Sequence, residues 1–218
     1  MSPTAAAPSS PCAPRKRRKD ARPSELTQAA LTLFVERGFA ATRLEDVAQR
    51  AGVAKGTLYL YFDNKEALFK AVIQEGLLPA LSQGTAIVEN HRGSAFDLLR
   101  QLIHAWWQLI GETPLGGLPK LMIAESRNFP DIARYYYEHV IVPGRALIAH
   151  TLELGMANGE FRPMPLDTCI DVIIAPVLML MIWRHSMEYC QCGQSDPKTY
   201  LELQLQLLHK GLLAECKV

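Results

Sequence analysis

Residues 51 to 69, AGVAKGTLYLYFDNKEALF, combine a glycine turn, two lysines, a threonine and two tyrosines. Lysine ammonium groups and tyrosine hydroxyl groups donate hydrogen bonds to phosphate oxygens, and small residues on a helix allow a close approach to base edges. The stretch has no acid, histidine or cysteine arranged for catalysis. Its residue types therefore favour binding to a nucleic acid.

The apolar residues around this stretch predict three helices. A first helical face over residues 26–34 ends at Gly38, which supplies a left-handed stop. Thr42 is a candidate cap for a second helix, whose apolar residues recur at i, i+3, i+4 and i+7 over residues 44–51. A tight glycine turn then leads into a third helix over residues 54–61. This is the helix-turn-helix plan, in which the second helix of the motif enters a major groove.

The predicted third helix has one face available for a partner. Leu58 and Phe62 face the first two helices, and Gly56 leaves room for an approaching surface. Lys65 begins the next helix, after a cap at Asp63 or Asn64, so its charge and the helix dipole can together hold a phosphate. The alternative is that the tyrosines cap a local core and the lysines are ordinary surface charges. The outward residues are Lys55, Thr57, Tyr59 and Tyr61.

Four segments carry a family resemblance: LFVERGF (33–39), AT (41–42), DVAQRAGVAKGTLYLYF (46–62) and NKEALF (64–69). Together they make residues 24–72 resemble the DNA-binding domain of the tetracycline-repressor (TetR) family of bacterial transcriptional regulators. The resemblance implies an all-α fold with an N-terminal three-helix DNA-binding domain and a larger helical domain that binds a small molecule and dimerises. It also implies a DNA-binding regulator, usually a repressor.

The resemblance assigns roles to residues at matching positions. Ala54 departs from the family, which often has a hydroxyl residue there, and Arg43 is expected to offset the lost contact. The implied phosphate contacts are Thr42, Tyr61 and Lys65, and the implied groove contacts are Lys55, Gly56, Thr57 and Tyr59.

Charge and composition divide the chain into three parts. Residues 1–22 carry a net charge of about +5 in a chain whose total is +1, and are rich in Pro, Ala and Ser. We expect them to form a disordered basic arm that neutralises phosphates, or else a solvated tail with no partner. The helix-turn-helix domain is predicted at 23–69 and the ligand-binding and dimerisation domain at 70–218.

A helix predicted over residues 66–83 would connect the two domains through Leu68, Phe69, Val72, Ile73 and Leu77. By resemblance, an inducer displaces this helix and changes the separation of the two recognition helices of a homodimer. Large apolar residues between 102 and 183 are candidates for the pocket wall, although most such residues simply form the core. Only one of the adjacent Trp106 and Trp107 can face a pocket. The candidate ligand-binding residues are Trp106, Trp107, Met122, Glu125, Phe129, Tyr136, His139, Met179 and Trp183.

The two last helices are predicted to form the dimer surface. Residues 172–183 are apolar on all sides, and this run is shorter than the ~20 residues that span a bilayer. Residues 200–213, YLELQLQLLHKGLL, fit both a two-residue and a helical period. Their composition favours a helix. Two such helices from each subunit would form a two-fold interface, which implies a pseudo-palindromic operator.

Two other classes of function are weaker. Cys190 and Cys192, with His185 and His209, suggest a metal or redox sensor, but the paired spacing of a strong zinc site is missing. An enzyme using Glu125 or His139 lacks a nucleophile paired with a base. Five irregularly spaced cysteines indicate a reducing cytoplasm, and no signal peptide is visible. We expect a non-enzymatic transcriptional regulator without cofactor or metal, whose partners are double-stranded operator DNA, a small, largely apolar effector and a second copy of the chain, with no membrane.

Overall fold

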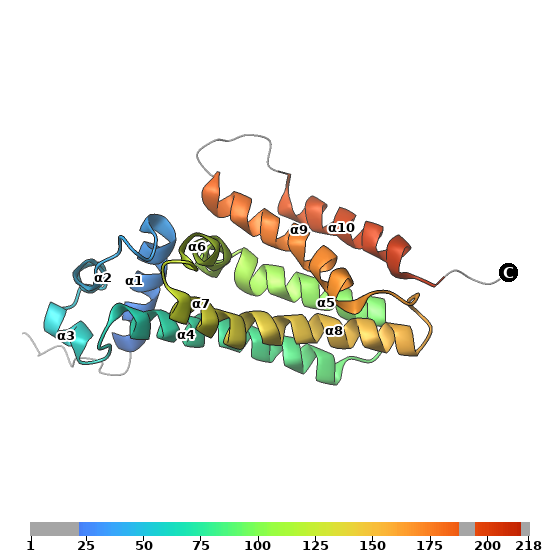
Figure 1. The fold of residues 1–218 in the computed structure, drawn as a ribbon, viewed down its shortest axis with the longest axis horizontal. Helices are drawn as coiled ribbons and strands as arrows, with labels where there is room; N and C mark the ends of the chain where they lie inside the picture. Colours follow the sequence, from blue (N-terminus) through green and yellow to red (C-terminus); the bar gives the residue numbers. More distant parts are fainter. Residues whose placement is uncertain (1–21, 188–194, 215–218) are drawn as a thin grey trace, which may run out of the picture.

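The computed structural model describes residues 22–187 and 195–214. Within these ranges all the regular elements are helices and there is no β-strand, which confirms the all-α prediction. Helices α1 to α3 form one end of an elongated molecule, and α4 runs from them along the larger bundle (Figure 1). The elements are α1 (Arg22–Arg37), α2 (Leu44–Arg50), α3 (Lys55–Tyr59), α4 (Lys65–Asn90), α5 (Ala95–Trp106), the π-helical turn η1 (Trp107–Gly111), the 3-10 turn η2 (Pro114–Gly117), α6 (Leu118–Glu125), α7 (Pro130–Tyr136), the π-helical turn η3 (Tyr137–Ile141), α8 (Val142–Ala157), α9 (Leu166–Ser186) and α10 (Pro197–Leu212).

The first three helices have the predicted helix-turn-helix arrangement. Gly38 ends α1 with φ +88°, and Gly52 turns the chain between α2 and α3 with φ +67°, a left-handed conformation in which a side chain would be strained. Leu58 and Phe62 are buried in the apolar core, as predicted. The third helix ends at Tyr59 rather than at residue 61.

Helix α4 begins and is packed as expected, but it is longer. Asn64 is its N-cap and accepts a hydrogen bond of 2.7 Å from the Ala67 amide. The helix continues past residue 83 to Asn90, so the predicted domain boundary after residue 69 lies inside it. The five predicted apolar positions of α4 are all buried: Leu68, Phe69, Val72, Ile73 and Leu77.

The small N-terminal unit and the larger bundle share one contiguous cluster of buried apolar residues. Contacts outside α4 connect them as well. The ring centroids of Phe39 and Phe129 are 4.7 Å apart, and Glu125 accepts a hydrogen bond of 3.1 Å from the Ala40 amide. Gly117 approaches α1 so closely that a Cβ there would lie 2.5 Å from Val35 Cγ1. The N-terminal unit therefore rests on η2 and α6 as well as on α4.

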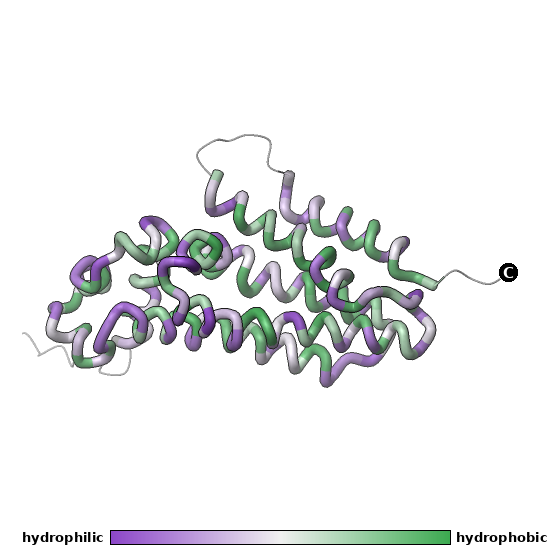
Figure 2. The backbone as a smooth tube through the Cα atoms, viewed as in Figure 1, coloured by the Kyte–Doolittle hydropathy of each residue, from purple (hydrophilic) through white to green (hydrophobic). Residues whose placement is uncertain are grey.

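Helix α9 extends the predicted apolar run in both directions. By length and composition alone, this helix and the stretch Pro130–Ala157 are apolar enough to cross a membrane. In the fold, α9 buries Ile173, Val177 and Met181 against the bundle and leaves other apolar side chains exposed. Figure 2 shows the high hydropathy of α9 along most of its length.

Helices α9 and α10 lie side by side and leave apolar side chains exposed on their outer face (Figure 1). Leu201 and Leu205 are buried while Leu203 and Leu207 are exposed, so α10 is a helix with a buried stripe, as predicted. We call the exposed set the α9–α10 surface; its members are Val172, Met179, Trp183, Leu203 and Leu207. A surface of this kind suits association with another apolar surface.

Replacing both Leu203 and Leu207 by Glu should convert a dimer to a monomer, because two carboxylates would be placed within an apolar interface. Sedimentation equilibrium at micromolar concentration measures the change. Leu60→Glu is the matched control, because Leu60 is an even more exposed leucine, at the opposite end of the molecule. A dimer that survives the double substitution would show that association uses another surface.

Candidate DNA-binding surface and ligand cavity

Helix α3 presents a short face of polar and small residues to the outside. Lys55, Gly56 and Tyr59 are exposed and Thr57 is half-buried, whereas Leu58 on the opposite side is buried. The helix has no side-chain cap, because Ala54 occupies the N-cap position. Its first amide groups therefore have no side-chain acceptor, which suits an approaching phosphate.

No neighbouring atom of the described chain packs closely enough on Gly56 to require a glycine there. A Cβ added at this position would meet nothing within 4 Å, and the residue does not have a positive φ. The absence of a side chain therefore serves neither packing nor backbone geometry within the described chain. It leaves the centre of the α3 face open to an external surface.

Lys55 is held in an ion pair on this face. Its Nζ lies 2.6 Å from Oε1 of Glu45, and both side chains are exposed. Their hydrogen bond raises the pKa of Lys55 and lowers the pKa of Glu45. An exposed ion pair is weak in water, so Lys55 can leave Glu45 for a more favourable acceptor.

Tyr61 is exposed just beyond α3, and Leu60 beside it is the most exposed large apolar residue of the described chain at 81%. Sequence reasoning missed Leu60. The available signal was its position: Leu60 lies midway between Leu58 and Phe62, which face the core, so it must point away from the core.

The predicted phosphate contact from the side chain of Thr42 requires correction. This side chain is only 1% exposed. Its hydroxyl donates to the carbonyl oxygens of Gly38 at 2.7 Å and Leu33 at 3.2 Å, closing the turn after α1. Thr42 is also not the cap of α2, because Arg43 is the N-cap residue. Arg43 itself is exposed, as a DNA contact would require.

Lys65 is also committed to the fold. Its Nζ donates to the carbonyl oxygens of Phe39 at 2.6 Å, Ala40 at 3.0 Å and Thr42 at 3.0 Å. An ammonium group has three protons, so these bonds use all of its donors. Burial lowers the pKa of Lys65, and the nearby charge of Glu125 opposes that shift. The predicted phosphate contact is therefore replaced by a structural role, in which Lys65 holds the α1–α2 loop on the start of α4.

Glu125 belongs to the same contact and lies outside the predicted ligand pocket. Besides the Ala40 amide, it accepts a hydrogen bond of 3.3 Å from Asn128. Its carboxylate is the group through which α6 contacts the α1–α2 loop. The prediction that it orients a ligand does not fit this position.

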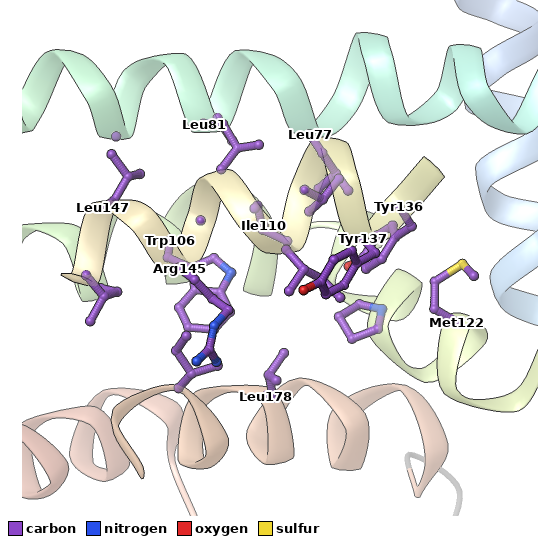
Figure 3. A pocket seen from close by; sticks show the side chains of 18 of the residues that line it. Leu77, Leu81, Trp106, Ile110, Met122, Tyr136, Tyr137, Arg145, Leu147 and Leu178 are labelled. Carbon is purple, nitrogen blue, oxygen red and sulfur yellow. The ribbon is translucent and has the colours of Figure 1, made fainter. Parts of the chain in front are cut away.

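A cavity of about 810 Å³ lies within the larger bundle, between α4, α5, α6, α7, η3, α8 and α9 (Figure 3). This volume is in the range of small-molecule sites. Among the predicted ligand-binding residues, Trp106, Met122 and Tyr136 line it. Burial raises the pKa of Tyr136 far above its usual value, so its hydroxyl stays neutral. The full lining is Leu77, Ala80, Leu81, Gly84, Leu102, Trp106, Ile110, Pro119, Met122, Ile123, Ser126, Ala133, Arg134, Tyr136, Tyr137, Val140, Ile141, Gly144, Arg145, Leu147, Ile148, Asp171, Ile174, Ala175 and Leu178.

The other predicted pocket residues lie elsewhere. Trp107 is buried and donates to Glu112, so only one of the two adjacent tryptophans faces the cavity. Phe129 packs on Phe39, and His139 stacks on the ring of Tyr135 at 4.0 Å between centroids. Met179 and Trp183 belong to the α9–α10 surface.

Sequence reasoning missed all three charged residues of the cavity: Arg134, Arg145 and Asp171. Arg145 donates to Asp171, which is far from it in the chain. The order of residues gives no indication of that pairing, because the two residues lie on different helices.

The described ranges contain no cluster of three or more His, Cys, Asp and Glu residues that could hold a metal ion. Cys190 and Cys192, on which the metal- or redox-sensor alternative rests, lie outside those ranges, as does the basic arm up to residue 21. Cys169 is a half-buried free thiol whose pKa is raised by burial. A raised pKa disfavours the reactive thiolate.

Two family models match this chain. One is described as "Bacterial regulatory proteins, tetR family" and matches residues 26–72. The other is described as "Tetracyclin repressor-like, C-terminal domain" and matches residues 90–188. The first match spans the helix-turn-helix unit, and the second spans most of the elements that line the cavity.

Proteins similar to this chain are named as transcriptional regulators. The helix-turn-helix-type transcriptional regulator RutR of Escherichia coli K12 is 44% identical over 180 residues, which cover 80% of this chain and 76% of RutR. The transcriptional repressor KstR2 of Mycolicibacterium smegmatis is 28% identical over 178 residues, 77% of each chain. The solved structure of the ketosteroid transcriptional regulator KstR2 of Mycobacterium tuberculosis has a TM-score of 0.68 at 22% identity, and the match covers 91% of this chain and 98% of that one.

Replacing Lys65 by Met should lower the free energy of unfolding by about 1.5–3 kcal/mol, because three carbonyl groups lose a charged donor. Thermal and denaturant unfolding measure the effect. Lys55→Met is the matched control, because the Lys55 ammonium is exposed and its loss should leave the melting temperature unchanged. Equal stability of the two variants would contradict the structural role of Lys65.

Proposed function

This chain belongs to the TetR family of bacterial regulatory proteins, and we propose that it is a repressor that leaves a pseudo-palindromic operator when a small, largely apolar molecule enters its cavity. It is a DNA-binding transcriptional regulator and not an enzyme, as its relatives are named. The observation that carries the proposal is the connection of an open α3 face to an 810 Å³ cavity through α4 and α6.

The α3 face supports a division of labour on DNA. Lys55, Gly56, Thr57 and Tyr59 lie on the helix that would enter the major groove, where base edges can be read. Arg43 and Tyr61 flank this helix and are exposed, so they suit phosphate contacts that set the position of the protein. We assign no phosphate contact to the side chains of Thr42 and Lys65, because their donors are already used.

A homodimer formed through the α9–α10 surface would present two α3 helices. Two-fold symmetry of the protein implies two related half-sites, spaced by a multiple of about one DNA turn. The exposed leucines of α10 supply an apolar area for the association. Repression is supported by the name of the KstR2 relatives, and a site in the cytoplasm follows from binding to chromosomal DNA.

The ligand site is the cavity. Its lining is largely apolar and includes the aromatic side chains of Trp106, Tyr136 and Tyr137. Such walls bind apolar molecules through buried area, while a few polar groups set orientation. A solved relative of this fold is named a ketosteroid regulator, which supports an apolar effector of moderate size.

Two elements can carry the effect of a ligand to the α3 face. Leu77 and Leu81 of α4 line the cavity, and Lys65 at the start of the same helix holds the α1–α2 loop. Met122 of α6 also lines the cavity, and Glu125, one turn later, contacts that loop. A ligand that shifts either helix therefore moves the loop that supports α2 and α3. This is allostery by displacement of packed elements.

The test is a fluorescence-anisotropy titration of the protein against the DNA upstream of its own gene, with and without a panel of apolar compounds. Lys55→Ala and Thr57→Ala should weaken binding by about 1–3 kcal/mol and change the preferred bases, because they remove groove contacts. Tyr61→Phe should weaken binding to all sequences alike. If all three variants lose affinity without a change in base preference, the division between reading and positioning is wrong.

Glu125→Ala should separate ligand binding from DNA release. Its DNA affinity should stay within about threefold of the wild type, while the effector concentration for half-release rises about tenfold, because a charged hydrogen bond between α6 and the loop is lost. Glu138→Ala is the control, since Glu138 is exposed on η3 and does not line the cavity. Unchanged release in Glu125→Ala would show that the Glu125 hydrogen bond does not carry the effect of the ligand.

A further inference from the structure

The charged side chains of the cavity form an ordered arrangement at its α8–α9 side. Arg145 of α8 lines the cavity and forms ion pairs with two acids of α9, Asp171 and Asp167. In Figure 3 the Arg145 side chain extends from α8 toward α9, where Leu178 lies. The arrangement thus joins the two helices that bound this side of the cavity.

Arg145 is the inner member of the group. Its side chain is 30% exposed, whereas Asp171 is 67% exposed and Asp167 is 95% exposed. The carboxylates therefore lie toward water and the guanidinium lies toward the cavity. Asp171 also lines the cavity, so a bound molecule meets both charges, of which the guanidinium is the less exposed to water.

Most donors of Arg145 are available. Among the described residues its one hydrogen bond goes to Asp171, and Asp167 lies 3.7 Å away as an ion-pair partner only. A guanidinium has five N–H donors in a planar fork, which matches the two oxygens of a carboxylate. Release of Asp171 would cost little, because that carboxylate is already largely in water.

A second arginine in the lining gives the cavity a net positive charge. Arg134 of α7 lines the cavity and has no ion-pair partner within residues 22–187 and 195–214. The lining therefore has two arginines against one aspartate, among side chains that are mainly apolar.

We infer that the effector is an apolar molecule bearing one anionic group, such as a carboxylate, which the guanidinium of Arg145 binds in place of Asp171. The apolar part fills the space between α4, α8 and Trp106. The inference rests on the proposed function and specifies the ligand class of the same cavity. Because Arg145 connects α8 to α9, its transfer from Asp171 to a ligand would also loosen that connection.

The alternative is an effector that carries a positive charge. An amphipathic cation could contact the rings of Trp106 and Tyr137 and pair with Asp171. Asp171, however, is the outer member of its pair and already has Arg145 as partner. A cation would have to displace Arg145 and leave that guanidinium without an acid in the cavity.

The experiment compares three matched series by isothermal titration calorimetry on the full-length protein: octanoate, dodecanoate and hexadecanoate, the alcohols of equal length, and the alkyltrimethylammonium ions of equal length. The carboxylate should bind at least tenfold more tightly than its alcohol at the best length. Tighter binding of the ammonium series, or equal binding of acid and alcohol, overturns the inference. In the case of equal binding the proposed function survives, because an apolar ligand still enters the cavity.

Amino-acid substitutions test whether the carboxylate of the ligand binds to Arg145. Arg145→Gln should reduce carboxylate affinity at least tenfold and change alcohol affinity less than threefold, and Arg145→Lys should give an intermediate loss because it keeps the charge without the fork. Asp171→Asn should increase carboxylate affinity a fewfold by removing the competing acid. Arg134→Gln, the matched control, should change it less than threefold.

The contrary outcomes are distinct. A larger loss in Arg134→Gln than in Arg145→Gln, or a loss in Asp171→Asn, overturns the assignment to Arg145. If Arg145→Gln fails to fold, Arg145→Lys and Asp171→Asn decide, since both keep the shape of the site. If none of the nine compounds binds and none releases operator DNA, the proposed effector site and the inference both fail.

Discussion

The placement of the DNA-binding surface depends on one ammonium group. Lys65 donates to three carbonyl oxygens of the α1–α2 loop and so fixes that loop to the first residue of α4. The unpaired carbonyl groups of a loop usually accept hydrogen bonds from water. Here one ammonium group donates to three of them. Thr42 closes the same loop from inside. The short helix α2 packs on α1 and α3 and forms two ion pairs with α1, Arg37–Asp46 and Arg50–Glu36. The loop and the buried Leu58 complete the set of contacts that orient α2 and α3.

The two functional regions are thereby parts of one mechanical unit. A contiguous apolar core runs beneath both, and α4 contributes to the cavity with one half and to the DNA-binding unit with the other. Contacts at Val35, Phe39 and Ala40 add a second connection through η2, α6 and the residues after it. Since packed interiors resist compression, a ligand of sufficient size displaces whole helices rather than single side chains.

The sequence predicted what depends on local periodicity and turn chemistry. The three helices of the motif, the glycine turns, the Asn64 cap and the buried positions of α4 follow from spacing and residue type. The destinations of polar side chains did not follow, because their partners are distant: Lys65 meets carbonyl groups more than twenty residues earlier, and Arg145 meets an acid on another helix. The same limit applied to the cavity. Large apolar residues were recognisable, but which of them face inward depends on how the helices pack.

The π-helical turn η3 separates Arg134 from Arg145 within an otherwise continuous helix. Such a turn holds one residue more than an α-helical turn, and each residue rotates a helix by about 100°. Deletion of a single codon within Tyr137–Ile141 would restore the regular helix and rotate every side chain beyond it. Arg145 would then leave the cavity wall and a neighbour would take its place. Evolution can thus exchange the chemical class of the signal through one small deletion, while the genes under control stay the same.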